Sequence, residues 1–203
     1  LATVAERINT LLTNPHITLP RGTDTFLQSI LSFYELNNEI TSRQEEALKR
    51  VERHHSPENI ESHKEWVANY NDEHRKIAKI CALYYYSHGQ YYYDTAHRVL
   101  SEPDFIPTEK KYRSMCENKY AAKIVSSTLA DPKYPVGTFV QNRASCPHHV
   151  RVALVGGKAG MVLATDTGPV LSAVKGGKRY KILPIGSTTP IEAEERHIKK
   201  ARV

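Results

Sequence analysis

The stretch from residue 134 to residue 203 most constrains the fold, because glycine turns and short β-type runs alternate along it. It follows a proline-bracketed break, Asp131-Pro132-Lys133-Tyr134-Pro135, and it holds eight of the ten glycines of the chain. The β-type runs cover residues 136–143, 150–155, 161–165, 179–185 and 190–193, and the basic segment 196–202 is short enough to be a final strand. Short strands with Gly-rich turns predict a small closed barrel or a sandwich.

Helical patterns fill the first 133 residues. Apolar residues recur at one-face spacing from about Asp24, which can cap a helix. Thr41-Ser42-Arg43-Gln44 has the form of a capping box, which opens the next helix. Ser56-Pro57 predicts the start of a long helix that ends near Gly89. Two more helices are expected over residues 90–100 and after residue 108.

The expected fold class is therefore α+β, with two domains. A helical bundle would cover residues 1–133, and a small β-barrel would cover residues 134–203. The proline-bracketed break between them is the expected boundary.

Charge is distributed unevenly between these two parts. Residues 1–133 hold 17 Lys and Arg against 18 Asp and Glu, whereas residues 134–203 hold 11 against 4. The net charge of +6 at pH 7 therefore resides in the C-terminal part. Such asymmetry indicates a domain for an anionic partner attached to a neutral helical part. Solubility charge on a small barrel is the alternative explanation.

Basic residues in the C-terminal turns and strands are the candidate nucleic-acid contacts. If the turns share one rim, Lys and Arg can neutralise phosphates while Tyr180 stacks on an unpaired base. Exposed turns that simply favour Gly and Lys are the alternative, and the pattern does not distinguish DNA from RNA. The expected nucleic-acid-binding residues are Lys158, Lys175, Lys178, Arg179, Tyr180, Lys181, Lys199 and Lys200.

Two tyrosine triplets flank a predicted helix–helix corner. Six phenols near one corner cannot all face a core, because a buried ring needs a partner for its hydroxyl. Aromatic residues concentrate at recognition hot spots, so this corner is a candidate protein-binding surface. A Tyr-rich helix that packs within the bundle is the alternative. The expected partner-binding residues are Tyr84, Tyr85, Tyr86, Tyr91, Tyr92 and Tyr93.

No catalytic, metal or cofactor signature stands out. Zinc sites show paired ligands twice over, whereas Cys146-Pro147-His148-His149 is one pair and His54-His55 with His63 lies in a polar segment. Residues 156–160 lack the Lys-Ser/Thr step of a phosphate-binding loop. Cys116 lies on an apolar helical stripe, which favours burial. The sequence predicts neither metal nor cofactor and favours a protein that is not an enzyme, while an active site built from distant residues stays open.

A cytoplasmic location is expected. No run of about 18 apolar residues is present. The N-terminal residues do not resemble a signal peptide, because Glu6 and Arg7 fall where an apolar core is needed. Three scattered cysteines are unlike a disulfide framework.

Two resemblances add to these expectations. Residues 136–140, 160–164, 179–183 and 194–198 resemble SH3-like barrels of the KOW and Tudor type, in strand order and in the short turn before the last strand. Residues 26–31 with 41–44 are similar to a helical hairpin of phage and viral replication-related proteins. The first resemblance implies an SH3-like barrel, and the second implies a virus-encoded protein, which would act in the host cytoplasm.

The resulting hypothesis is a non-catalytic, phage-encoded adaptor that binds nucleic acid or associates with transcription or translation. Its barrel would hold DNA or RNA, and its helical domain would dock a host or viral protein. The alternative is a protein-interaction module, such as an inhibitor or accessory subunit of a host machine, without nucleic-acid contact. Fold alone does not decide between them, since small barrels bind peptides as readily as nucleic acid.

Overall fold

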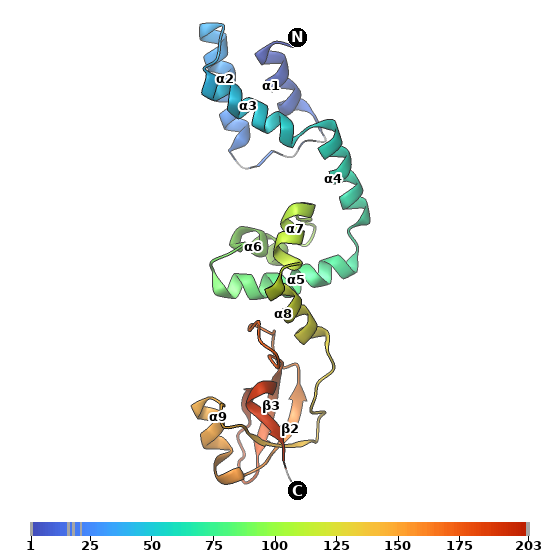
Figure 1. The fold of residues 1–203 in the computed structure, drawn as a ribbon, viewed down its shortest axis with the longest axis vertical. Coiled ribbons are helices and arrows are strands. Elements are labelled where there is room, and N and C mark those ends of the chain that lie inside the picture. Colours follow the sequence, from blue (N-terminus) through green and yellow to red (C-terminus); the bar gives the residue numbers. More distant parts are fainter. Residues whose placement is uncertain (1, 16, 18, 21, 202–203) are drawn as a thin grey trace. The chain divides into compact units, whose positions relative to one another are not determined.

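The chain forms two compact units, Leu1–Asn69 and Tyr70–Val203 (Figure 1). The computed structural model describes residues 2–15, 17, 19–20 and 22–201. The division between the units falls inside the stretch that the sequence predicts as one helical domain. The expected boundary at residues 133 and 134, where helices give way to strands, stays a prediction.

The first unit contains α1 (Val4–Thr13), α2 (Thr23–Asn37), α3 (Ser42–His54) and α4 (Pro57–Asn69). The first three helices supply the buried side chains of its core, whereas α4 buries none. The core residues are Ile8, Leu11, Leu27, Ile30 and Leu48.

Cap chemistry explains where these helices begin. The capping box at α3 is confirmed: Thr41 Oγ1 accepts from the Gln44 N–H, and the Gln44 side chain accepts from the Thr41 N–H. The expected cap by Asp24 is wrong. The cap position of α2 is Gly22, which has a left-handed φ of 84° and makes no side-chain cap bond; glycine adopts this conformation without steric cost.

One arginine joins α1 to α3. The Arg7 guanidinium donates to both oxygens of Glu52, at 2.7 and 2.8 Å, and to Glu45 at 3.0 Å. The same hydrogen bonds raise the pKa of Arg7 and lower that of Glu45. Two of the α3 carboxylates are therefore turned toward α1.

A group of helices in the second unit precedes its sheet. They are α5 (Asp72–His88), α6 (Tyr93–Ser101), α7 (Glu109–Cys116) and α8 (Lys119–Leu129). The long helix expected from Ser56 to Gly89 is wrong, because it is broken between Asn69 and Asp72. Asn71 starts a new helix there by accepting from the His74 N–H at 3.0 Å. The predicted stop at Gly89 is confirmed, in the left-handed conformation.

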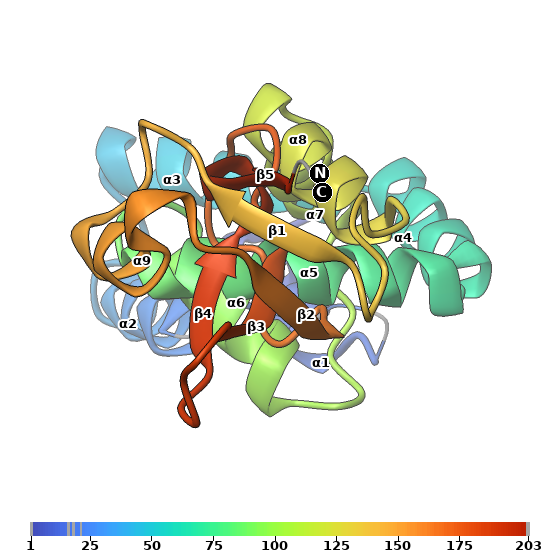
Figure 2. The same ribbon diagram turned by 90° about the horizontal axis from the view of Figure 1, so that it is seen from below.

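A five-stranded antiparallel sheet completes the second unit, so the α+β class is confirmed. Its strands are β1 (Phe139–Asn142), β2 (Gly160–Thr165), β3 (Arg179–Pro184), β4 (Ile191–Glu194) and β5 (Ile198–Lys200). Their order is β4-β3-β2-β1-β5, and Figure 2 shows β1 between β2 and β5. The edge strands β4 and β5 do not pair among the described residues, so the sheet is not closed.

The expected strand at residues 150–155 is wrong, because α9 (His148–Ala153) occupies most of it. Val150 and Leu154 are both fully buried. They are four residues apart, so a helical turn brings both onto one face. Val152 and Val155 are exposed. The segment is therefore an amphipathic helix with one buried face, followed by a turn.

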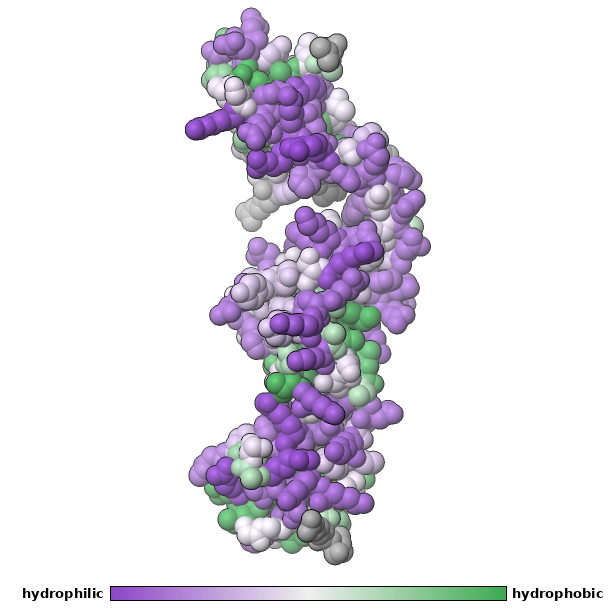
Figure 3. All heavy atoms as spheres, viewed as in Figure 1, coloured by the Kyte–Doolittle hydropathy of each residue, from purple (hydrophilic) through white to green (hydrophobic). Residues whose placement is uncertain are grey.

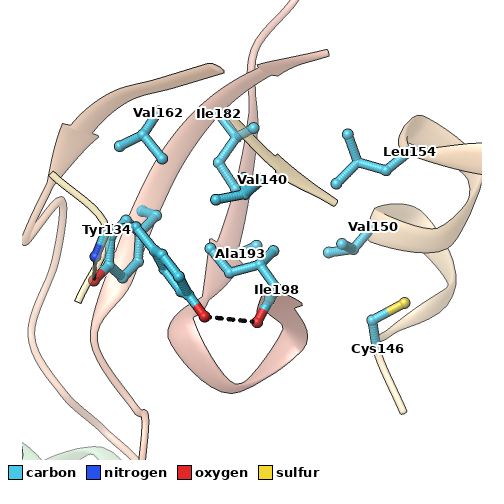
Figure 4. Packing of buried hydrophobic residues seen from close by; sticks show 10 residues of the cluster. Tyr134, Val140, Cys146, Val150, Leu154, Val162, Ile182, Ala193 and Ile198 are labelled. Carbon is cyan, nitrogen blue, oxygen red and sulfur yellow. Dashed lines mark hydrogen bonds between the residues drawn. The ribbon is translucent and has the colours of Figure 1, made fainter. Parts of the chain in front are cut away.

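The core of the sheet lies between its inner face and α9. Figure 4 shows Val150 of α9, and Leu154 directly after that helix, pointing toward Val140, Ile182 and Ile198 from the strands. Along β3 the buried residues alternate with more exposed ones, and in β1 the buried Val140 follows the exposed Phe139, as expected for strands with one face on a core. The inner and outer faces of the sheet are thereby fixed.

Hydrogen bonds of Tyr180 and Tyr134 together tie four segments of this unit: residues 133–134, β3, the turn after β4, and β5. The Tyr180 hydroxyl donates to Glu195 Oε2 at 2.7 Å, in the 3-10 turn η2 (Glu195–His197) between β4 and β5. The same carboxylate oxygen accepts from the Lys133 N–H at 3.2 Å. The Tyr134 hydroxyl reaches the Ile198 carbonyl at 3.5 Å (Figure 4). Burial and the Glu195 hydrogen bond raise the pKa of Tyr180.

We expect Tyr180→Phe to destabilise the second unit by about 1–3 kcal/mol, because Glu195 loses a hydrogen-bond donor in a largely desolvated site. Urea unfolding followed by near-UV circular dichroism measures the change. Tyr91→Phe is the control, since Tyr91 is 69% exposed. Equal unfolding midpoints for the two variants would contradict this assignment.

Candidate nucleic-acid interface

Two residues of the expected nucleic-acid site are buried. Tyr180 has an exposed fraction of 0%, and its ring lies in the core of the sheet. The prediction that it stacks on a base is wrong, because no ring face is free. Lys178 is 5% exposed; its ammonium is paired with Asp166 and donates to the Thr128 carbonyl at 3.1 Å. It links α8 to the loop between β2 and β3, so the prediction of a phosphate contact at Lys178 is also wrong.

The remaining turn lysines do not share one rim. Lys158 precedes β2 at the end where Gly160 lies opposite Pro184. Lys175 precedes β3 at the other end, where Thr165 lies opposite Tyr180. A strand of this length spans roughly 17–20 Å. Both lysines are exposed, but they belong to opposite ends of one hairpin.

Ion pairing neutralises the β3–β4 side of the sheet. Arg179 lies 3.3 Å from Glu192, and Arg196 lies 2.6 Å from Glu194. Lys181 is exposed, directly opposite Glu192 in the strand register. The carboxylates of this region are therefore concentrated beside β3 and β4, where part of the expected site lies.

The β1–β5 edge carries cations without such partners. Arg143 and Lys199 are exposed, and within the described part of the region the ion pairs involve Lys178, Arg179 and Arg196 instead. Gln141 lies opposite Lys199, and residues opposite one another share a face. Arg143 follows directly after Asn142, the last residue of β1, and its side chain is exposed. Its Nε donates to the Ile198 carbonyl at 2.8 Å, which holds the side chain against β5.

An exposed aromatic ring lies on the same face. Phe139 is 41% exposed and alternates with the buried Val140. It precedes Gln141 by two residues, so both lie on one face of β1, and Arg143 follows directly after the strand. We call these residues together with Lys199 the β1–β5 face. Phe139 and Arg143 were not among the residues predicted from the sequence. Both fall in the β-type run 136–143, but only the pairing of β1 with β5 brings them near Lys199.

Histidines near this edge do not form a metal site. His149 is hydrogen-bonded to the Glu192 carbonyl at 3.1 Å. Burial lowers the pKa of His197 and thereby favours the neutral ring. Throughout the described ranges, no group of three His, Cys, Asp or Glu side chains is placed to hold a metal ion.

The cysteines are free and buried. Contact with the Cys81 thiol and burial raise the pKa of Cys116. The thiolate is the nucleophilic form of cysteine, so this environment disfavours a nucleophilic role for Cys116.

The tyrosine corner is partly exposed. Tyr86 and Tyr93 are stacked, with ring centroids 5.2 Å apart and an interplanar angle of 16°. His97 packs beside them, at 5.9 Å from the Tyr86 ring. We call Tyr86, Tyr93 and His97 the aromatic stack. Tyr92 is 38% exposed and has a φ of 55°, a left-handed conformation that is uncommon for a bulky residue.

One tyrosine of the expected partner surface is buried. Tyr85 is 6% exposed, and its hydroxyl accepts from Asn118 Nδ2 at 2.8 Å. It joins α5 to the cap of α8, so its assignment to a partner surface is wrong. Tyr84 is half-buried against Tyr85 and His88. The other four tyrosines of the set are exposed: Tyr86, Tyr91, Tyr92 and Tyr93.

Comparison of the chain with protein-family models, curated proteins and solved structures finds no match. Of the helices in the described ranges, none combines the length and apolar character needed to cross a membrane.

We expect mild nitration of the native protein to modify Tyr86, Tyr91 and Tyr93 and to spare Tyr180 and Tyr85. Exposed phenols react, and burial both shields the ring and raises the pKa of Tyr85 and Tyr180. Peptide mass spectrometry measures the extent at each site. Rapid nitration of Tyr180 in the folded protein would show that the sheet core is not packed as described.

Proposed function

We propose that this protein is a non-catalytic nucleic-acid-binding adaptor whose contact surface is the β1–β5 face. The observation that carries the proposal is the grouping of Phe139, Gln141 and Arg143 beside Lys199, with the carboxylates of the region paired elsewhere. The net charge of the C-terminal part, with 11 Lys and Arg against 4 Asp and Glu, supports attraction of a polyanion. This surface differs from the turns before β2 and before β3, where the sequence predicted the contact.

The cations and the aromatic ring of the β1–β5 face have different roles. Arg143 and Lys199 contact phosphates, and these contacts provide affinity with little sequence preference. Phe139 stacks on an unpaired base, which favours a single strand over a duplex. Lys200 continues the basic edge, while Lys158, Lys175 and Lys181 add long-range attraction.

We further propose that the sheet is a small SH3-like barrel in which β4 and β5 approach without pairing. The strand order β4-β3-β2-β1-β5 and the 3-10 turn before β5 support this assignment, because the resemblance implies both. A phage origin and a cytoplasmic site of action remain part of the proposal.

The double variant Arg143→Gln/Lys199→Gln tests the β1–β5 face. We expect weaker binding to labelled single-stranded DNA and RNA, because two phosphate contacts are lost. The slope of log K against log salt should fall by up to about 1.4, since each contact to a single strand contributes about 0.7. Fluorescence anisotropy at several salt concentrations measures both quantities.

The matched control is Arg179→Gln/Arg196→Gln, which removes the same charge from residues already paired with Glu192 and Glu194. It should retain most of the salt slope. Equal losses of binding in both double variants would show that the effect comes from net charge and not from the β1–β5 face. An absence of binding by the unmodified protein at low salt would overturn the nucleic-acid proposal.

A second candidate function, docking of a partner protein, is favoured by the aromatic stack. Tyr86 and Tyr93 are 42% and 43% exposed although their rings are large and apolar, and aromatic residues dominate interface hot spots. The neighbouring Tyr86 hydroxyl raises the pKa of Tyr93. This surface would act alone in a protein-interaction module without nucleic-acid contact.

We expect Tyr86→Ala/Tyr93→Ala to abolish capture of a specific protein from host lysate if the second function holds. Affinity capture with mass spectrometry measures it. Tyr120→Ala is the control, because Tyr120 is 48% exposed on α8. Capture that is lost in Arg143→Gln/Lys199→Gln and retained in the tyrosine variant would favour the nucleic-acid function instead.

A further inference from the structure

A hollow of about 330 Å³ lies where α3 meets α4 in the first unit. It is lined by Arg50, Arg53 and His54 from the last turns of α3 and by Asn59 from the first turn of α4. Its volume is at the lower end of small-molecule sites. All four lining residues carry hydrogen-bond donors, and two are permanently cationic.

Ion pairing inside the unit explains why this corner is basic. Glu45 and Glu52 are two of the three carboxylates of α3, and Arg7 of α1 draws both to itself. The third, Glu46, lies 3.9 Å from Arg50, at the limit of an ion pair. Arg53 forms no ion pair in the described part of the unit; its Nε donates to the Lys49 carbonyl at 3.4 Å. The two guanidiniums therefore face solvent with little compensation.

Hydrogen bonds fix the shape of the corner. Asn59 Nδ2 donates to the Arg53 carbonyl at 2.7 Å, which holds the first turn of α4 against the end of α3. The Ser56 hydroxyl accepts from the Asn59 N–H at 3.4 Å. Partial burial, and secondly the neighbouring His54, lowers the pKa of His55. Figure 3 shows hydrophilic side chains over most of the visible face of α3 and α4.

We propose that the α3–α4 hollow is a phosphate-binding site and that its ligand is a backbone phosphate of nucleic acid. A planar guanidinium offers two parallel N–H donors to phosphate oxygens, so Arg50 and Arg53 can clasp one group from two sides. His54 and Asn59 add donors at the rim. Phosphate binding stands by itself, whereas its assignment to nucleic acid rests on the proposed function.

The first experiment titrates inorganic phosphate into the full ¹⁵N-labelled chain at constant ionic strength. We expect saturable shifts of the amide signals of Arg50, Arg53, His54 and Asn59. Arg50→Gln/Arg53→Gln should weaken phosphate binding at least tenfold. Arg43→Gln/Lys64→Gln removes the same charge from the same unit outside the hollow and should leave binding unchanged. Shifts that do not saturate, or that persist in Arg50→Gln/Arg53→Gln, would overturn the site.

The second experiment measures the salt dependence of single-stranded oligonucleotide binding with the same variants. Loss of one phosphate contact should lower the salt slope by about 0.7 in Arg50→Gln/Arg53→Gln and not in the control. Saturable phosphate binding with an unchanged slope would support the phosphate site and overturn the nucleic-acid ligand. If the unmodified chain binds no oligonucleotide, the proposed function and this ligand fail, and the phosphate titration still decides the site.

Discussion

The hydrogen bond from the Tyr180 hydroxyl to Glu195 is the interaction on which the β1–β5 face depends. It holds the 3-10 turn after β4 against the N-terminal end of β3. The same carboxylate also accepts a hydrogen bond from the Lys133 N–H. The chain leaves this turn directly into β5, which then pairs with β1. Without that turn, Lys199 would not lie beside Gln141 and Arg143. Tyr180 is buried and is not itself a proposed ligand contact, yet it helps to position Lys199 and Arg143, which are.

Both units use a shielded cation to gather carboxylates. Arg7 takes Glu45 and Glu52 in the first unit, and Lys178 takes Asp166 in the second. Among the described residues, Arg143, Lys199 and Arg53 form no ion pair, and Arg50 has only its contact with Glu46 at 3.9 Å. An exposed ion pair contributes little to stability. The main effect of this arrangement is therefore to determine which surface cations remain available to an anionic ligand.

Local signals in the sequence were accurate where a single residue decides the structure. The Thr41 capping box, the Gly89 stop and the runs that became β2 and β3 were confirmed, because caps and glycine conformations act over a few residues. The same signals missed the breaks at Asn71 and Asn118, where asparagine starts a new helix inside an apolar pattern that continues. Residues 150–155 were misassigned, since β-branched residues at helical spacing also suit one buried face.

By itself, the sequence determined the α+β class, the concentration of positive charge after residue 134 and the excess of tyrosine around residue 88. Composition and short-range pattern are sufficient for such properties. Only the tertiary structure decided which of these groups reach solvent. Tyr180, Lys178 and Tyr85 are buried, while Phe139, Arg143, Arg50 and Arg53 are exposed. The reason is that burial and charge pairing depend on contacts between residues far apart in the chain, and a linear pattern does not contain them.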